Sequence, residues 1–265
     1  MPLSRILLRL ELALWRRRGR LPLLWWRDDG TQADTPALRR LLALSHRHAV
    51  PLTLAVTPPA AGAPTSSALA ALLAACPLVT VAQHGITHRN IAGPGEAPSE
   101  VPRVIGLGML ASEIGRAAAA LEGLPNRLPV FVPAWNRLTP ALAAAAAQAG
   151  FAGLSGHGGQ DAAVAPLPRL DVHLDLLDRD GPPRFQGEAS VTLHLVRLLR
   201  EGRREGRWDA PIGLLTHHLD HDEAAWRFLD RLLAELGPRA RIAPLGTLLG
   251  LPAMGAPGSC PAAAA

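Results

Sequence analysis

The sequence has no lysine and no tyrosine, and only two of its 265 residues are cysteines. All 27 basic residues are therefore arginines, in a chain rich in alanine, glycine and proline. This composition is typical of GC-rich coding sequence, so the net charge of +5 is poor evidence for a nucleic acid partner, and we expect none. Two cysteines cannot build a disulfide framework, which fits a reducing compartment.

Long apolar runs are also absent. No stretch reaches the ~18 residues that a membrane span needs, so the sequence predicts no transmembrane helix. Arg5, Arg9 and Glu11 interrupt the stretch where a signal peptide needs an apolar core, and we expect a cytoplasmic protein. Residues 4–18 have the periodicity of an amphipathic helix, which predicts an N-terminal segment 1–20 packed on the main domain.

Hydrophobic residues make up 48% of the chain, which fits a globular domain with a sizeable core. Apolar runs predict strands, and periodic segments between them predict helices. The predicted strands are 21–27, 51–57, 78–82, 128–132, 151–155, 170–174 and 212–215, and the helices are 36–48, 66–75, 110–121, 139–150, 189–201 and 222–236. Strand and helix alternate about seven times without a Gly-x-Gly-x-x-Gly motif, which predicts a parallel α/β barrel over 21–251. The tail, 252–265, is rich in alanine, proline and glycine and is expected to be disordered.

The first predicted strand ends in two adjacent carboxylates, Asp28 and Asp29, followed by Gly30. The carboxyl ends of strands are where α/β folds keep their chemistry. Adjacent side chains of an extended segment point apart, so one carboxylate can hold a metal while the other faces a substrate. Asp-Asp-Gly also occurs in ordinary turns, so this triplet identifies a site only together with other motifs.

Histidines follow two further predicted strands. His84 and His88 are spaced i, i+4, and on a helical turn they would present two imidazoles to one cation. With one carboxylate they form a 2-His-1-Asp set, which leaves open positions for water and substrate, as in catalytic metal sites. His217 and His218 follow the last strand, and one of them is a candidate acid for a leaving group. A metal, a base and an acid together predict hydrolysis of an ester or amide.

The order Asp-Asp-Gly, His-x-x-x-His, a proline-aromatic segment and Leu-Leu-x-His spans residues 24–218. It resembles the NodB-homology polysaccharide deacetylases of carbohydrate esterase family four. The resemblance implies a distorted (β/α)7 barrel that removes an acyl group, such as N-acetyl, from a carbohydrate or related small molecule. By the same resemblance Asp28 is the catalytic base, and Asp29, His84 and His88 hold a divalent metal, usually zinc.

The chain departs from the family pattern in two places. Trp26-Arg27 precedes the two acids where Thr-Phe is common, and Pro133-Ala134-Trp135 stands where the family has an Arg-x-Pro-Tyr motif. The arginine that orients the base in the family is absent from that motif, and Arg27 or Arg137 is the candidate to replace it. Trp135 is a sugar-binding face or a packing residue. The predicted substrate-binding residues are Arg27, Pro133, Trp135, Asn136 and Arg137.

Two points stay open in the sequence. The acid is His217 or His218, and His217 is favoured because it stands nearer the strand end. Asp175 loosely matches the acidic residue that supports the catalytic histidine in the family. A barrel that binds a ligand or partner without turnover is the alternative to the enzyme, and the stretch 91–106, rich in glycine and proline, is a candidate lid beside the site.

Overall fold

The computed structural model describes residues 2–59, 63, 65–158, 166–179 and 181–251. The predicted tail 252–265 lies outside the described residues. The strands are β1 (Leu23–Thr31), β2 (Leu52–Val56), β3 (Val79–His84), β4 (Arg127–Val132), β5 (Gly153–Leu154), β6 (Leu174–Asp175), β7 (Leu177–Asp178), β8 (Arg184–Phe185), β9 (Ile212–Thr216) and β10 (Arg241–Ile242). The helices are α1 (Leu3–Arg17), α2 (Pro36–His48), α3 (Ser67–Ala74), α4 (Leu107–Ala120), α5 (Pro140–Gln148), α6 (Glu188–Arg204), α7 (Glu223–Leu236) and α8 (Leu245–Leu248), with 3-10 turns η2 (Ala134–Asn136) and η3 (His218–Asp220).

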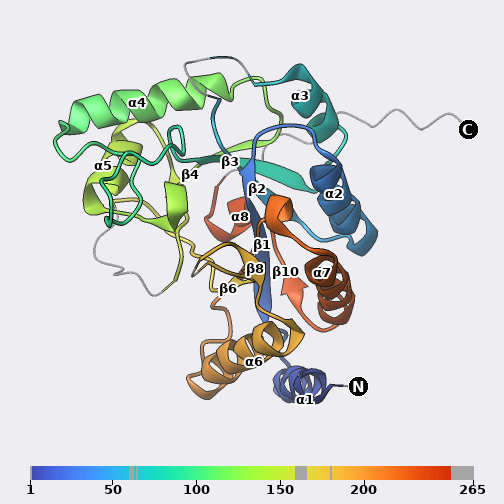
Figure 1. The fold of residues 1–265 in the computed structure, drawn as a ribbon. Coiled ribbons are helices and arrows are strands. Elements are labelled where there is room, and N and C mark those ends of the chain that lie inside the picture. The colour runs from blue at the N-terminus through green and yellow to red at the C-terminus, as the bar shows by residue number, and fades with distance from the viewer. Residues whose placement is uncertain (1, 60–62, 64, 159–165, 180, 252–265) are drawn as a thin grey trace, which may run out of the picture.

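One curved parallel sheet organises the molecule. Its strand order is β5-β4-β3-β2-β1-β9-β6, and β10 pairs with the start of β1. Isolated parallel bridges, Leu154 to Arg169 and His157 to Val172, continue the pairing from β5 towards the segment that leads into β6. The helices lie around this sheet (Figure 1), and the predicted distorted (β/α)7 barrel is confirmed.

Side-chain oxygens fix where several helices begin. Thr35 precedes α2, and Thr139 precedes α5, and each accepts a hydrogen bond from the backbone N–H three residues further on. Each threonine is followed by a proline at the first helical position, where a missing N–H costs nothing. These local signals explain why both helices start where the sequence predicts.

Strand β1 lies in the middle of the sheet, and its alternating side chains serve two cores. Trp25 packs inside the barrel, whereas Trp26 packs in the layer between sheet and helices. The sequence predicts that this strand stops before Asp28, but β1 continues beyond Asp29. The strand alternation therefore reaches the two acids and sends them to opposite faces of the sheet.

Helix α1 packs against α6 (Figure 1). Trp15 is 2% exposed, and its indole N–H donates to the carbonyl oxygen of Leu199 at 3.1 Å. Glu11 is buried and accepts a hydrogen bond from Arg203 at 2.5 Å. None of the helices in the described part of the chain has the length and hydropathy that a membrane crossing requires.

Candidate functional site

A cavity of about 700 Å³ lies at the carboxyl ends of the central strands. Side chains from all four motifs line it, although they are far apart in the sequence. The predicted site residues in its wall are Asp29, His84, His88, Trp135, Asn136, Arg137 and His217. The parallel sheet brings them together because the ends of β1, β3, β4 and β9 meet at one edge.

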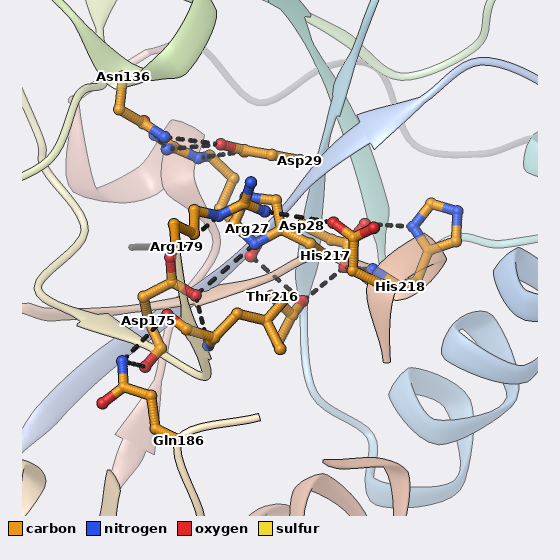
Figure 2. Close-up of polar contacts among 12 residues, drawn as sticks. Arg27, Asp28, Asp29, Asn136, Asp175, Arg179, Gln186, Thr216, His217 and His218 are labelled. Atoms are coloured by element: carbon orange, nitrogen blue, oxygen red, sulfur yellow. Dashed lines mark hydrogen bonds and ion pairs between the residues drawn. The ribbon is translucent and has the colours of Figure 1, made fainter. Parts of the chain in front are cut away.

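Asp29 is held by two neighbours. Arg27 donates to both carboxylate oxygens, from Nε to Oδ1 at 2.7 Å and from Nη2 to Oδ2 at 3.1 Å (Figure 2). Asn136 Nδ2 donates to Oδ2 at 3.1 Å. Burial alone would raise the pKa of Asp29, but the charges of Arg27, His84 and His217 and the hydrogen bonds from Arg27 outweigh it and hold the pKa well below its usual value. Asp29 is therefore ionised at neutral pH.

Arg27 lies behind the cavity wall. Its side chain is fully buried, and besides Asp29 it donates to the Ser155 hydroxyl at 2.5 Å, to the Gly156 carbonyl oxygen at 3.5 Å and to Asn136 Oδ1. Arg27 was predicted to bind substrate, but it does not line the cavity and has no free surface to do so. Pro133, predicted for the same role, is also buried and outside the lining.

His84 ends strand β3 with its ring directed by the backbone. Its Nδ1 lies 3.3 Å from the carbonyl oxygen of Val132, which leaves Nε2 for the cavity. Burial, only partly opposed by the charge of Asp29, lowers the pKa of His84 to about 4. The ring is therefore neutral at pH 7, the form that ligates a metal.

The backbone between His84 and His88 differs from the helical turn that the sequence predicts. Residues 85–88 form no helical turn, and His88 has a positive φ of 54°. The rings of His84 and His88 nevertheless lie 4.7 Å apart between centroids, and the ring of Trp135 lies 4.6 Å from that of His88. The i, i+4 spacing thus brings the imidazoles together through a tight turn and not through a helix.

Glu100 holds this turn. Its carboxylate accepts the backbone N–H groups of Ile86 at 3.0 Å, Thr87 at 3.0 Å and His88 at 2.8 Å. Gly85 has a φ of 66°, a backbone conformation that favours glycine, and a Cβ there would also lie 2.6 Å from Glu100 Oε1. Glu100 belongs to the stretch 91–106 that was predicted as a lid, and sequence reasoning missed it because an acid in a loop carries no signal of its target.

Asp28 points away from the cavity. It is fully buried and accepts hydrogen bonds from the Thr216 hydroxyl at 2.6 Å and the His218 backbone N–H at 3.0 Å, while His218 Nδ1 lies 2.5 Å from its Oδ1 (Figure 2). Neither Asp28 nor His218 lines the cavity. Asp28, which was predicted to be the catalytic base, therefore forms buried contacts with Thr216 and His218 instead of facing the cavity. It points this way because β1 stays extended through both acids.

His217 takes the opposite direction from His218. It lines the cavity, and its Nδ1 lies 3.6 Å from Asp175 Oδ1. Asp175 is oriented by the backbone N–H of Leu177, which donates to its Oδ1 at 2.9 Å. Of the two histidines left open by the sequence, the one favoured there is the one in the cavity.

The donor chemistry of Asp29, His84 and His88 fits a divalent metal. The carboxylate is ionised, His84 is neutral, and the contact of its Nδ1 with a backbone carbonyl leaves Nε2 to ligate. No three His, Cys, Asp or Glu side chains among the described residues are grouped closely enough to hold an ion. These three donors would therefore have to move closer together to bind one. Binding would require Asp29 to share its oxygens with the metal or to leave Arg27.

No family model matches the sequence, and no curated protein matches it. A solved family 4 acetyl xylan esterase from Clostridium thermocellum, in complex with a cobalt ion, is similar over 87% of this chain and 93% of that chain, with 15% identity and a TM-score of 0.56. The chain has the fold of the family 4 carbohydrate esterases. The predicted resemblance is confirmed at the level of the fold.

Two other structures with the family 4 esterase fold differ in what their names say of activity. The Bc1960 peptidoglycan N-acetylglucosamine deacetylase is 15% identical, and the match covers 88% of this chain and 90% of that chain, with a TM-score of 0.55. A protein of Bacillus anthracis described as a family 4 pseudoenzyme is 14% identical, and the match covers 87% of this chain and 66% of that chain, with a TM-score of 0.50. The structural similarity establishes the family 4 fold. Sequence identities this low do not establish activity, which has to be argued from the site.

Proposed function

We propose that the protein is a metal-dependent hydrolase of the polysaccharide deacetylase type, which removes an acyl group from a carbohydrate or related small molecule. The observation that carries the proposal is the meeting of Asp29, His84, His88 and His217 in one cavity at the carboxyl end of a family 4 esterase fold. This set combines the donors of a catalytic metal site with a proton-transfer group.

In this proposal Asp29, His84 and His88 hold the divalent metal, and the ion we propose is zinc, which two histidines and one carboxylate hold in known catalytic sites. When bound, the metal supplies an acidified water and polarises the acyl oxygen. Trp135 and Arg137 line the same cavity and contact the substrate beside the reacting acyl group.

His217 carries the proton transfers. Because Asp28 lies outside the cavity, His217 takes the proton from the attacking water and delivers it to the leaving nitrogen or oxygen. The Asp175 carboxylate lies 3.6 Å from His217 Nδ1, beyond hydrogen-bond distance, and its negative charge stabilises the protonated ring between the two transfers.

The test combines zinc titration with acyl release. Wild-type protein titrated calorimetrically with zinc should bind one ion, and Asp29→Ala or His88→Ala should abolish binding. With zinc present, His217→Gln should lower kcat on an acetylated sugar by about 10² to 10⁴ while leaving zinc affinity unchanged. Retention of full activity in His217→Gln would refute the assignment of both proton transfers to His217.

A second candidate function is a barrel that binds an acylated ligand without turnover. Two observations favour it, since Asp28 faces away from the cavity and Arg27 occupies both oxygens of Asp29. It predicts that zinc-supplemented protein binds an acetylated oligosaccharide, releases no acetate over many hours, and binds equally well after His217→Gln. Acetate release that depends on His217 decides for the hydrolase.

A further inference from the structure

Arg27 supplies the positive charge beside Asp29 that a bound metal ion would otherwise supply. Its guanidinium forms a two-point contact with Asp29, the one carboxylate in the proposed ligand set, and its side chain is fully buried. Ser155, Gly156 and Asn136 take its remaining donors, so the guanidinium is fixed from behind. The charge of Asp29 is thereby compensated by the chain itself.

The same contact opposes a metal. A divalent ion at His84 and His88 needs an oxygen of Asp29, and both oxygens already accept hydrogen bonds from Arg27, one of them also from Asn136. An ion drawn to Asp29 would also lie close to the guanidinium, and two cations in a buried site repel. The wide spacing of the three donors agrees with a site set for Arg27 and not for an ion.

We propose that Arg27 and a divalent metal compete for Asp29, so that Arg27 keeps the site folded and charge-balanced without metal and weakens metal binding. The proposal rests on the proposed metal site and adds a residue that sets its affinity. The opposite behaviour is also known for neighbours of a metal ligand, since a hydrogen bond that orients a ligand strengthens binding. Competition predicts that removing Arg27 strengthens metal binding, whereas orientation of Asp29 by Arg27 predicts that removing it weakens metal binding.

The experiment is zinc titration of wild type and of the variants Arg27→Met, Arg27→Lys, Arg169→Met and Asp29→Ala, with cobalt absorption as a second readout of coordination. Arg27→Met removes the positive charge and the two hydrogen bonds to Asp29 but keeps an unbranched side chain that can stay buried. Zinc should bind this variant at least tenfold more tightly than it binds wild type. Arg27→Lys keeps the charge but loses the two-point contact, and its affinity should lie between the two.

Arg169→Met is the matched control. Arg169 pairs with Asp171 at the same two-residue spacing, at 2.7 and 2.8 Å, and neither residue lines the cavity. Its zinc affinity should stay within twofold of wild type. A gain in this variant equal to that of Arg27→Met would overturn the proposal.

The remaining outcomes separate the proposal from the metal site beneath it. If Asp29→Ala abolishes zinc binding but Arg27→Met binds zinc no more tightly than wild type, competition is refuted and the metal site stands. If wild type, Arg27→Met and Arg27→Lys all fold and none binds zinc, the metal site and the competition fall together. If Arg27→Met does not fold, Arg27→Lys decides, since affinity equal to or weaker than wild type refutes competition.

Discussion

At the scale of single residues, the two adjacent acids have different partners because they lie on opposite faces of one strand. Asp29 faces the cavity and is neutralised by Arg27, whereas Asp28 faces the helices and is bound by Thr216 and His218. A buried carboxylate is tolerated only when it is hydrogen-bonded and paired, and each acid meets this requirement separately. Neighbours in sequence therefore have separate roles.

The placement of Asp28 predicts a structural and not a catalytic effect of changing it. Asp28→Asn weakens the hydrogen bonds to Thr216 and His218, so the free energy of unfolding should fall by about 1–3 kcal/mol in urea titrations. The control Asp34→Asn alters an ion pair whose arginine is exposed and should cost less than about 1 kcal/mol. Folded Asp28→Asn should keep kcat within a few-fold of wild type, and a loss of a thousandfold at unchanged stability would restore it as the base.

His221 predicts how stability depends on pH. Both of its ring nitrogens are buried without a hydrogen-bond partner among the described residues, and burial lowers its pKa to about 4. The unfolded state therefore binds the proton first, and stability should fall as the pH drops from about 6.5 to about 4, by as much as about 3 kcal/mol from this group.

The measurement is urea unfolding at pH 7 and pH 4.5 for wild type and His221→Phe. The phenyl ring keeps the contact with Trp226, now 4.7 Å between ring centroids, and cannot titrate. The difference in unfolding free energy between the two pH values should shrink in the variant. An unchanged difference would mean that other groups account for the acid loss.

At the scale of elements, one loop residue sets the shape of the turn that carries His88. Three successive backbone N–H groups converge on the carboxylate of Glu100, which satisfies donors that no helix or strand uses. The long loop thus has a fixed anchor beside the site, and it positions an imidazole from 12 residues away in sequence.

Removing that anchor should loosen both the turn and the metal site. Glu100→Ala should lower the free energy of unfolding by about 1–3 kcal/mol and weaken zinc binding by about 10-fold, because the backbone that carries His88 is no longer held. Glu96→Ala, in the same loop and paired with Arg103, is the control and should change zinc affinity less than twofold. Equal effects of the two variants would show that the loop, and not the Glu100 contact, supports the site.

The sequence predicts most elements because their signals are local. The strands β2, β3, β4 and β9 are apolar runs of the right length, and threonine caps with prolines mark the starts of α2 and α5. The extension of β1 through Asp29 could not be predicted, because two acids and a glycine are ordinary turn residues and only pairing with β2 and β9 keeps them extended. His217, which the sequence favours as the acid, lines the cavity. Ser155, which binds Arg27, and Glu100, which holds the turn of His88, could not be predicted because they come from distant parts of the chain.

At the scale of the whole molecule, the N-terminal helix is attached through a few large contacts. Trp15 packs edge-on against Trp208 at 5.1 Å between ring centroids, and ion pairs join Glu11 to Arg203 and Glu235 to Arg9. Trp15 belongs to the apolar core between the sheet and the helices that cover it. The N-terminal helix is therefore part of that core.

Truncation of this contact should destabilise the barrel as one unit. Trp15→Ala should lower the free energy of unfolding by about 3–5 kcal/mol, in a single transition seen alike by circular dichroism and fluorescence. Leu10→Ala changes a residue of the same helix that is 57% exposed and should cost less than about 0.5 kcal/mol. Two separate transitions in Trp15→Ala would mean that the helix and the barrel unfold independently.

The central position of β1 has a consequence for how the chain can change. A one-residue insertion or deletion within this strand would exchange its faces, moving Asp28 into the cavity and burying Asp29 with its arginine under the helices. Lengthening the loop between β3 and α4 leaves every strand register intact. Natural variation in length is therefore expected to accumulate in that loop and to be excluded from β1.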